Sequence, residues 1–216
     1  QDTLAIPFLL QAYELHEYDA VTIGRQELMF GVEWVRSIER ILPVVSANVS
    51  YRDGSPVGVK VRVIERGDET FAITGITTRK ALEQLGPKVY EHFSLMDVDQ
   101  ALALAFEDVP DDARRIVLVQ APMDEIRKMK DQWSGVRLVI GGFNSDLIEG
   151  VEFLDKTAYV QVGAKSRYMG FLQFKGTRIK ADLISIQTHL PDDPRIAEIA
   201  LELRKERVRN RPEIHY

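Results

Sequence analysis

Hydrophobic residues recur along this chain with two spacings, one typical of amphipathic helices and one typical of strands. In residues 31–42, apolar side chains return every three or four positions until Pro43, a residue that ends helices. Asp97 stands directly before another such segment, where its carboxylate is suited to cap the first turn. The pattern predicts helices at residues 7–16, 31–42, 97–106 and 123–133, and a last helix that begins at Pro194.

Short apolar runs between these helices are typical of buried strands. In residues 57–63, valine alternates with glycine, lysine and arginine, which indicates a half-exposed strand. Gly67 and Asp68 form a turn signal before residues 71–76, so the two segments predict a hairpin. The other predicted strands are residues 20–23, 44–47, 116–119, 136–140, 158–162, 170–174 and 180–186.

Strands that alternate with helices predict an α/β layered domain, and the hairpin and late strands make its sheets mixed rather than purely parallel. A chain of 216 residues with 45% hydrophobic content is long enough to bury one sizeable core. Residues 204–211 are rich in lysine and arginine. We therefore expect the domain to span residues 1–203, followed by a basic helix end or linker at residues 204–216.

The composition excludes several classes of protein. A net charge of -5 provides no basic field for nucleic acid or an anionic membrane surface. The absence of cysteine excludes disulfides, thiolate metal sites and cysteine nucleophiles. No apolar run approaches the roughly 20 residues of a membrane span. The start, Gln1-Asp2-Thr3, has no basic n-region, so we expect any export signal to be gone from this sequence.

Several segments resemble the motifs of one enzyme family, in the order of that family. Residues 18–31 read YDAVTIGRQELMFG and resemble the motif YDAVTLGNHEFDFG. Residues 46–49 read SANV, as the family does, and residues 73–78 read ITGITT, which is similar to VIGLTT. Residues 138–145 read LVIGGFNS and resemble LIIGGHSH. Together with VQVGA and RYMG after residue 159, these segments resemble a calcineurin-like metallophosphoesterase domain of the 5′-nucleotidase type.

The resemblance runs from about residue 12 to about residue 175 and implies a layered α/β sandwich with mixed sheets. The opening strands of the family would lie upstream of Gln1, so we expect the N-terminal strands to be missing. An incomplete sheet leaves an open edge, and we expect a protein partner or a missing covalent segment at this N-terminal sheet edge. The family also implies a periplasmic or extracellular location.

Enzymes of this family hold two divalent metals about 3.5–4 Å apart to activate water and clamp a phosphate. By the motif matches, Arg25 and Gln26 stand where the family has the asparagine and histidine of GNHE. Gln120 stands at the histidine of VLSH, and Phe143 and Ser145 stand at the two histidines of GGHSH. Arginine stays protonated and phenylalanine has no donor atom, so the resemblance implies degenerate ligand positions without metal, cofactor or catalytic residues.

Two hypotheses describe Arg25. In the first, Arg25 and Arg167 form an anion contact at the old phosphate-binding edge, since guanidinium groups suit oxyanions. In the second, Arg25 fills the vacated metal cavity and pairs with Glu27 or another acid. We favour the second hypothesis.

Two functions remain in competition. The first is a non-catalytic pseudo-phosphoesterase module that acts as a scaffold or subunit of a larger assembly. The C-terminal residues resemble the linker by which degenerate nucleotidase-like domains join a multihaem cytochrome c, which is therefore one expected partner. The second is a metal-dependent phosphoesterase or 5′-nucleotidase whose N-terminal ligand motifs lie on a missing segment. The substitutions at the matched positions favour the first function.

Overall fold

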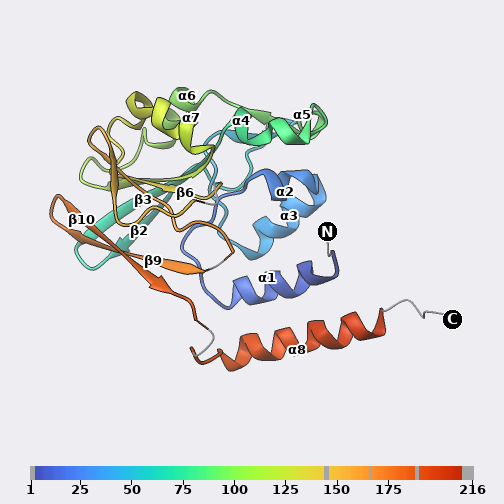
Figure 1. Ribbon diagram of the computed structural model, residues 1–216. Helices are drawn as coiled ribbons and strands as arrows, with labels where there is room; N and C mark the ends of the chain where they lie inside the picture. Colours follow the sequence, from blue (N-terminus) through green and yellow to red (C-terminus); the bar gives the residue numbers. More distant parts are fainter. Residues whose placement is uncertain (1–2, 144–145, 166, 188–189, 211–216) are drawn as a thin grey trace. The chain divides into compact units, whose positions relative to one another are not determined.

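The computed structural model describes residues 3–143, 146–165, 167–187 and 190–210 (Figure 1). The chain divides into two compact units. The larger unit is Asp19–Ile186, and the smaller unit combines the two chain ends, Gln1–Tyr18 and Gln187–Tyr216.

The larger unit is built on a six-stranded mixed sheet with the strand order β2-β3-β5-β6-β8-β7. The four central strands are parallel, and the edge strands β2 and β7 pair antiparallel with their neighbours. This confirms the predicted mixed α/β architecture. The strands are β2 Arg62–Arg66, β3 Glu69–Thr77, β5 Arg114–Gln120, β6 Leu138–Gly141, β7 Glu152–Leu154 and β8 Thr157–Val160.

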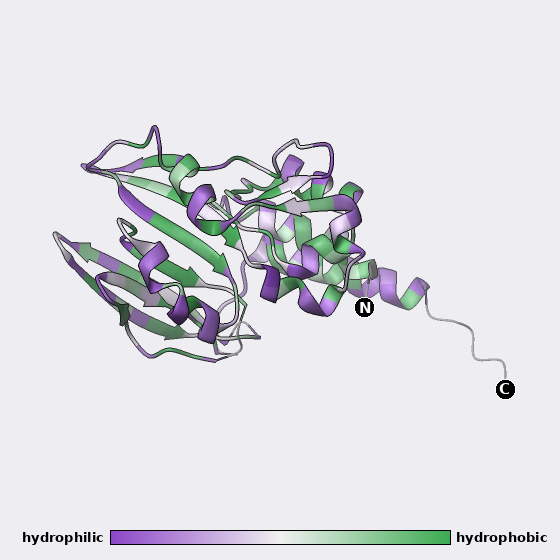
Figure 2. Cartoon of the chain, turned by 90° about the horizontal axis from the view of Figure 1, so that it is seen from above, coloured by the Kyte–Doolittle hydropathy of each residue, from purple (hydrophilic) through white to green (hydrophobic). Residues whose placement is uncertain are grey.

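Two apolar layers cover the two faces of this sheet. On one face, Trp133, Ile126 and Phe106 are buried against the central strands and belong to one hydrophobic cluster. On the other face lies the antiparallel hairpin of β9 Tyr168–Lys175 and β10 Arg178–Ser185. Its residues Leu172 and Phe174 pack against the second cluster. Figure 2 shows the hydrophobic colour concentrated along the strands, as expected for a layered sandwich.

Residues 20–23 and 44–47 were predicted as strands, but neither segment is a regular strand. Residues 44–47 are mostly buried, and residues 20–23 are mostly half-buried. Three successive backbone N–H groups bond to three different segments: Val45 N donates to Val21 O, Ser46 N to Val59 O, and Ala47 N to Gly75 O. Because the partner changes at every residue, the segment forms isolated bridges instead of a ladder.

The strand predicted at residues 57–63 is shifted toward the C-terminus, because β2 begins at Arg62. Gly58 has φ +65° and donates its N–H to the carboxylate of Glu39, so the backbone is not extended there. The predicted hairpin is confirmed, with Gly67 at φ +61° in the turn between β2 and β3.

Most predicted helices are confirmed with shifted ends, and the helix expected at residues 123–133 is split. α7 Met123–Lys128 is followed by the 3-10 helix η3 Lys130–Trp133, where the Trp133 Nε1–H donates to Ile126 O at 3.1 Å. Asp97 caps α6 as predicted, because its side chain accepts from Asp99 N. The remaining elements of this unit are α2 Arg25–Met29, α3 Val32–Ile41, β1 Val49–Tyr51, α4 Arg79–Leu82, η2 Glu83–Leu85, α5 Val89–His92, β4 Phe93–Leu95 and α6 Val98–Ala105.

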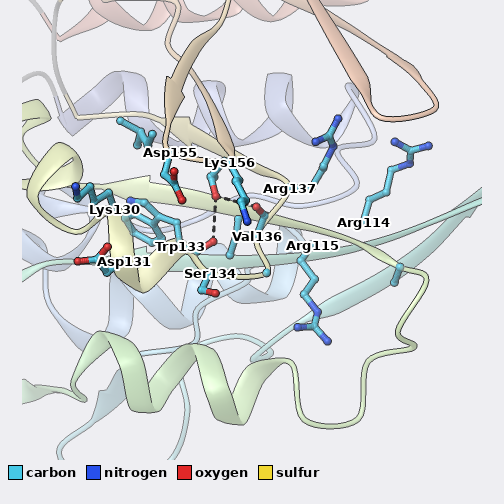
Figure 3. Close-up of a pocket in the computed structure, with 14 residues that line it drawn as sticks. Arg114, Arg115, Lys130, Asp131, Trp133, Ser134, Val136, Arg137, Asp155 and Lys156 are labelled. Carbon is cyan, nitrogen blue, oxygen red and sulfur yellow. Dashed lines mark hydrogen bonds between the residues drawn. The ribbon is translucent and has the colours of Figure 1, made fainter.

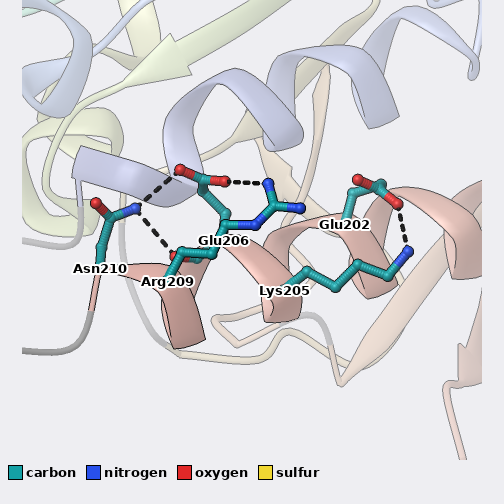
Figure 4. A network of polar contacts seen from close by, with 5 residues as sticks. All are labelled: Glu202, Lys205, Glu206, Arg209 and Asn210. Atoms are coloured by element: carbon teal, nitrogen blue, oxygen red, sulfur yellow. Dashed lines mark hydrogen bonds and ion pairs between the residues drawn. The ribbon is translucent and has the colours of Figure 1, made fainter.

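The smaller unit contains η1 Thr3–Ala5, α1 Ile6–Glu14 and α8 Pro194–Arg209. Asp193 caps α8, and its hydrogen bonds from Arg195 lower its pKa to about 2. Near the other end, Lys205 pairs with Glu202 at 2.8 Å and Arg209 with Glu206 at 3.2 Å (Figure 4). Helix α8 continues past residue 203, and the domain boundary at 203/204 stays a prediction.

In the described part of the chain, none of the helices combines the length and the apolar character required to cross a membrane.

Candidate functional site

The candidate site lies where the central strands β3, β5 and β6 end. These strands are parallel, so their carboxyl ends Thr77, Gln120 and Gly141 meet at one edge of the sheet. Open α/β sheets bind ligands at this kind of edge. Arg25, the first residue of α2, and Phe143, in the segment after β6, reach the same place.

Gln120 occupies the centre of this edge. A methyl group placed on Gly24 would lie 2.7 Å from Gln120 Oε1, and one placed on Gly142 would lie 2.6 Å from Gln120 Nε2. The glutamine side chain therefore fills the space between two glycine backbones, one before α2 and one after β6. A side chain at either position would force the end of the Gln120 side chain to move.

Arg25 and Phe143, the residues that follow these glycines, contact each other. The guanidinium carbon of Arg25 lies 5.6 Å from the centroid of the Phe143 ring, which is a cation–π distance. Arg25 Nη1 also donates to Gln84 Oε1. The structure thus brings Arg25, Gln120 and Phe143 together from three segments far apart in sequence.

The expectation that Arg25 pairs with Glu27 is wrong. The Glu27 carboxylate turns back and accepts from Gly24 N at 2.8 Å, which caps the first turn of α2. No ion pair of Arg25 with an acid is present among the described residues. The partners of Arg25 are an amide oxygen and an aromatic ring.

The other predicted site residues are placed differently. Gln26 is exposed on α2, and Ser145 lies outside the described residues. Arg167 is exposed just before β9, where its carbonyl accepts from Ile186 N at 2.9 Å. Within the described ranges, no contact joins Arg167 to Arg25. The anion contact of these two arginines therefore stays a prediction.

Buried polar residues fix the segments around the site. The Asn48 amide donates to Thr77 O at 2.8 Å and accepts from Thr77 N at 3.0 Å. Thr77 Oγ1 donates to Ile23 O at 2.7 Å, one residue before Gly24. These contacts attach both irregular extended segments to the end of β3. The sequence contains Asn48 within the SANV motif, but its structural role was not predicted.

A second buried pair supports the loop after β6. Tyr159 Oη donates to Gln161 Oε1 at 2.7 Å, and Gln161 Nε2 donates to Asp146 O at 2.5 Å. Burial raises the pKa of Tyr159 to about 12. A methyl group on Gly141 would lie 2.5 Å from Tyr159 Oη, so the pair also sets the path of the backbone toward Phe143. Sequence analysis missed this pair because neither residue stands in a ligand motif.

A cavity of about 220 Å³ lies beside this edge, lined by Thr78, Glu125, Gln132 and neighbouring residues. Thr78 Oγ1 donates to Glu125 Oε2 at 2.6 Å. The buried Gln132 Oε1 has no hydrogen-bond partner in the described structure.

The donor set at this edge does not fit the two-metal centre that the family resemblance implies. Such a centre requires imidazole, carboxylate and amide ligands aimed at one point. Here one position carries a permanent cation and another an aromatic ring without a donor atom. In the residues that the structure describes, no group of three or more histidine, aspartate or glutamate side chains is arranged to hold a metal ion. That Arg25, Gln26, Gln120, Phe143 and Ser145 occupy former metal-ligand positions stays a prediction.

Comparison with known proteins gives matches in structure. No protein-family model matches this sequence, and no curated protein matches it. Among solved structures, the sulfate thiohydrolase SoxB of Thermus thermophilus superposes on 96% of this chain with a TM-score of 0.83 and 16% identity. A 5′-nucleotidase precursor of Thermus thermophilus superposes on 95% with a TM-score of 0.77 and 18% identity. The calcineurin-like phosphoesterase YfkN of Bacillus subtilis superposes on 94% with a TM-score of 0.72 and 15% identity.

The chain spans 41% of the SoxB chain, 47% of the nucleotidase chain and 75% of the YfkN chain. These identities are low, so the likeness concerns the fold. The chain has the fold of a calcineurin-like phosphoesterase of the 5′-nucleotidase type, and it covers a part of such proteins.

Proposed function

We propose that this chain is a non-catalytic pseudo-phosphoesterase module that acts as a scaffold or subunit of a larger assembly. The observation that carries the proposal is the contact of the Arg25 guanidinium with the Phe143 ring, beside Gln120. These three side chains stand at the sheet edge where the family resemblance places metal ligands.

Electrostatics support this proposal. The guanidinium keeps its proton at all ordinary pH values. Two like unit charges about 4 Å apart repel by about 4 kcal/mol at an effective dielectric constant of about 20. A divalent cation beside Arg25 meets about twice that repulsion, and Phe143 supplies no lone pair to offset it. The Phe143 ring instead presents the negative face of its π system to Arg25.

The second candidate is a metal-dependent phosphoesterase whose further ligands lie on a segment outside this sequence. The likeness to SoxB, a sulfate thiohydrolase, and to a 5′-nucleotidase precursor favours it at the level of the fold. This candidate requires Arg25 to leave Phe143 and Gln84 before a metal binds between α2 and β6.

Metal analysis together with a hydrolase assay separates the two candidates. The purified full-length protein is incubated with Mn²⁺, Co²⁺ or Zn²⁺, desalted, and analysed for bound metal and for release of phosphate from AMP, ADP and ATP. We expect less than about one metal per ten chains, because two of the matched side chains offer no ligand atom. We also expect no metal-dependent phosphate release above the rate without protein.

Two variants sharpen the test. Arg25→Asn removes the cation at the site, and Arg62→Asn removes an exposed cation on the edge strand β2 as a matched control. The module proposal expects neither protein to hydrolyse nucleotides. Two bound metals and nucleotide turnover, both in the natural protein and in the Arg62→Asn control, would establish the hydrolase instead.

We further propose that a protein partner or a missing covalent segment completes the N-terminal sheet edge, where residues 20–23 and 44–47 form isolated bridges and no regular strand. The hairpin of β9 and β10 forms a sheet of two strands, and among the described residues no further strand pairs with either one. Two-stranded sheets are marginal by themselves and leave unpaired backbone groups at both edges. A multihaem cytochrome c remains one expected partner, and a periplasmic or extracellular location remains an expectation from the family resemblance.

Expression of residues 1–216 alone tests the need for a partner. Aggregation that is relieved by the added partner or upstream segment supports the proposal. A monodisperse monomer with one cooperative unfolding transition contradicts it.

A further inference from the structure

A second cavity, of about 500 Å³, lies at the opposite end of the sheet from Gln120. It is surrounded by the amino ends of β5, β6 and β8, the 3-10 helix η3 and the turn between β7 and β8 (Figure 3). Its volume falls within the range of about 300–1,000 Å³ that is typical of small-molecule sites.

The rim of this cavity is basic. Its cationic residues are Arg114, Arg115, Lys130, Arg137 and Lys156, and its acidic residues are Asp131 and Asp155. The chain as a whole carries a net charge of -5, so this concentration of positive charge runs against the overall balance. A cavity lined by basic residues focuses their positive electrostatic field and raises the local concentration of anions.

One of these cations is already neutralised. The Arg114 guanidinium donates to both carboxylate oxygens of Glu69, and it also donates to Gly176 O at 2.8 Å. Arg115 lies over the Phe106 ring at 5.3 Å, which orients its guanidinium without removing its charge. In the described part of the chain, Arg115, Lys130, Arg137 and Lys156 make no ion pair with an acid.

The floor of the cavity is apolar and firmly held. Trp133 is fully buried, and Val136 and Leu154 are 6% exposed. The Thr157 hydroxyl bonds to Trp133 O at 3.0 Å and to Val136 O at 2.9 Å, as the dashed lines of Figure 3 show. The polar groups of the floor already hydrogen-bond to one another. The polar contacts of a ligand would therefore be made with the cations of the rim.

Figure 3 shows Arg137 directed to one side of the sheet and Arg115 to the other, with Lys130 at the far end of the cavity. The charges therefore surround the cavity and do not converge on one point. Such an arrangement suits a ligand with several separated negative oxygens better than a single monovalent ion. Arginine recognises planar or tetrahedral oxyanions through paired N–H donors.

We propose that this cavity binds an oxyanion with at least two negative charges, of the polycarboxylate or phosphate type. The ligand lies over Trp133 and Leu154, and its oxygens accept from Arg115, Lys130 and Lys156. This site is independent of the edge that carries Arg25.

Calorimetric titration of the full chain at about 50 mM salt tests the proposal, with citrate and inorganic pyrophosphate as probes. Acetate serves as the monovalent control and glycerol as the neutral one. We expect at least one of the two probes to bind with a Kd below about 1 mM and acetate to bind at least about tenfold more weakly. A preference for citrate identifies a polycarboxylate ligand, and a preference for pyrophosphate identifies a phosphate ligand.

Paired variants locate the site. Lys130→Gln with Lys156→Gln removes two exposed rim cations, whereas Lys60→Gln with Arg62→Gln removes two exposed cations elsewhere with the same change in net charge. We expect the first pair to weaken binding by at least about tenfold and the second by less than about twofold. Circular dichroism confirms that both variants are folded.

Three results overturn the proposal. The first is the absence of heat and of chemical-shift change with either probe at 10 mM, a ceiling set about tenfold above the expected Kd. The second is equal weakening by both variant pairs, which indicates a general charge effect. The third is binding that is unchanged in the Lys130→Gln, Lys156→Gln protein.

Discussion

Gly75 in β3 faces Thr22 so closely that no side chain fits between them. A methyl group placed on Gly75 would lie 2.1 Å from Thr22 Oγ1 and 2.3 Å from Val45 O. The close approach allows Ala47 N to donate to Gly75 O at 2.8 Å, which attaches an extended segment to the side of the strand. The irregular chain at residues 20–23 and 44–47 thus depends on the missing side chain at position 75.

We therefore expect Gly75→Ala to destabilise the protein by more than about 2 kcal/mol, because the contact with Val45 O is with backbone and cannot relax easily. Urea unfolding followed by fluorescence measures the change in midpoint. Gly67→Ala is the matched control, since a methyl group there meets no atom within 4 Å. That variant should lose only about 1 kcal/mol, for its φ of +61°. Equal losses for the two variants would contradict the packing argument.

The contact of Arg25 with Phe143 predicts a measurable coupling. In a double-mutant cycle of Arg25→Ala and Phe143→Leu, we expect an interaction energy of about 0.5–1 kcal/mol, as found for partly exposed cation–π pairs. The control cycle joins Arg25→Ala to Phe153→Leu, a change at an exposed ring on β7. That cycle should be additive. Coupling of equal size in both cycles would show that the effect is not specific to the contact.

Regular elements with a clear period were predictable from the sequence. Helix α3, strand β5 and the hairpin of β2 and β3 lie within a few residues of the predicted positions. The spacing of their apolar residues reflects the face that each element buries. This spacing can be read within a single short segment of the sequence. The mixed, layered architecture followed from the order of these elements.

Irregular and site features were less predictable, because they depend on contacts between distant segments. Residues 44–47 have the composition of a buried strand, yet Val45 and Ala47 bond to different partners, so no ladder forms. The partner of Arg25 was predicted to be an acid and is Gln84, which stands 59 residues away. Local charge patterns do not reveal such a partner, because it is a neutral amide.

Asn48 provides a test of the buried polar contacts at the end of β3. Asn48→Ala leaves both the N–H and the carbonyl of Thr77 without their partners in a buried place. We expect a loss of about 2–3 kcal/mol in the free energy of unfolding, since an unsatisfied buried group costs about 1–3 kcal/mol. Asn210→Ala removes an exposed amide at the end of α8 and should cost less than about 0.5 kcal/mol. A small loss at Asn48 would mean that water replaces the amide.

The buried Tyr159 predicts a specific sensitivity to alkali. Its folded pKa is raised to about 12 from the ordinary value of 10.0, chiefly because burial disfavours the phenolate. A raised folded pKa contributes stability that is fully present below the unfolded pKa and is lost as the pH rises toward the folded pKa. Between pH 10 and pH 12 the unfolded chain therefore releases a proton that the folded chain retains, and folding becomes less favourable.

Tyr159→Phe removes this contribution, and the sign of its effect depends on the pH. At pH 7 the variant should be less stable by about 1–2 kcal/mol, because Gln161 Oε1 loses the hydrogen bond from the phenol. Between pH 9 and pH 12 it should lose less stability than the natural protein, so the two curves of stability against pH converge. Urea midpoints across this pH range give both curves, and the exposed Tyr13→Phe serves as the control for general alkaline effects. Parallel curves for the natural protein and Tyr159→Phe would show that Tyr159 does not keep its proton by burial.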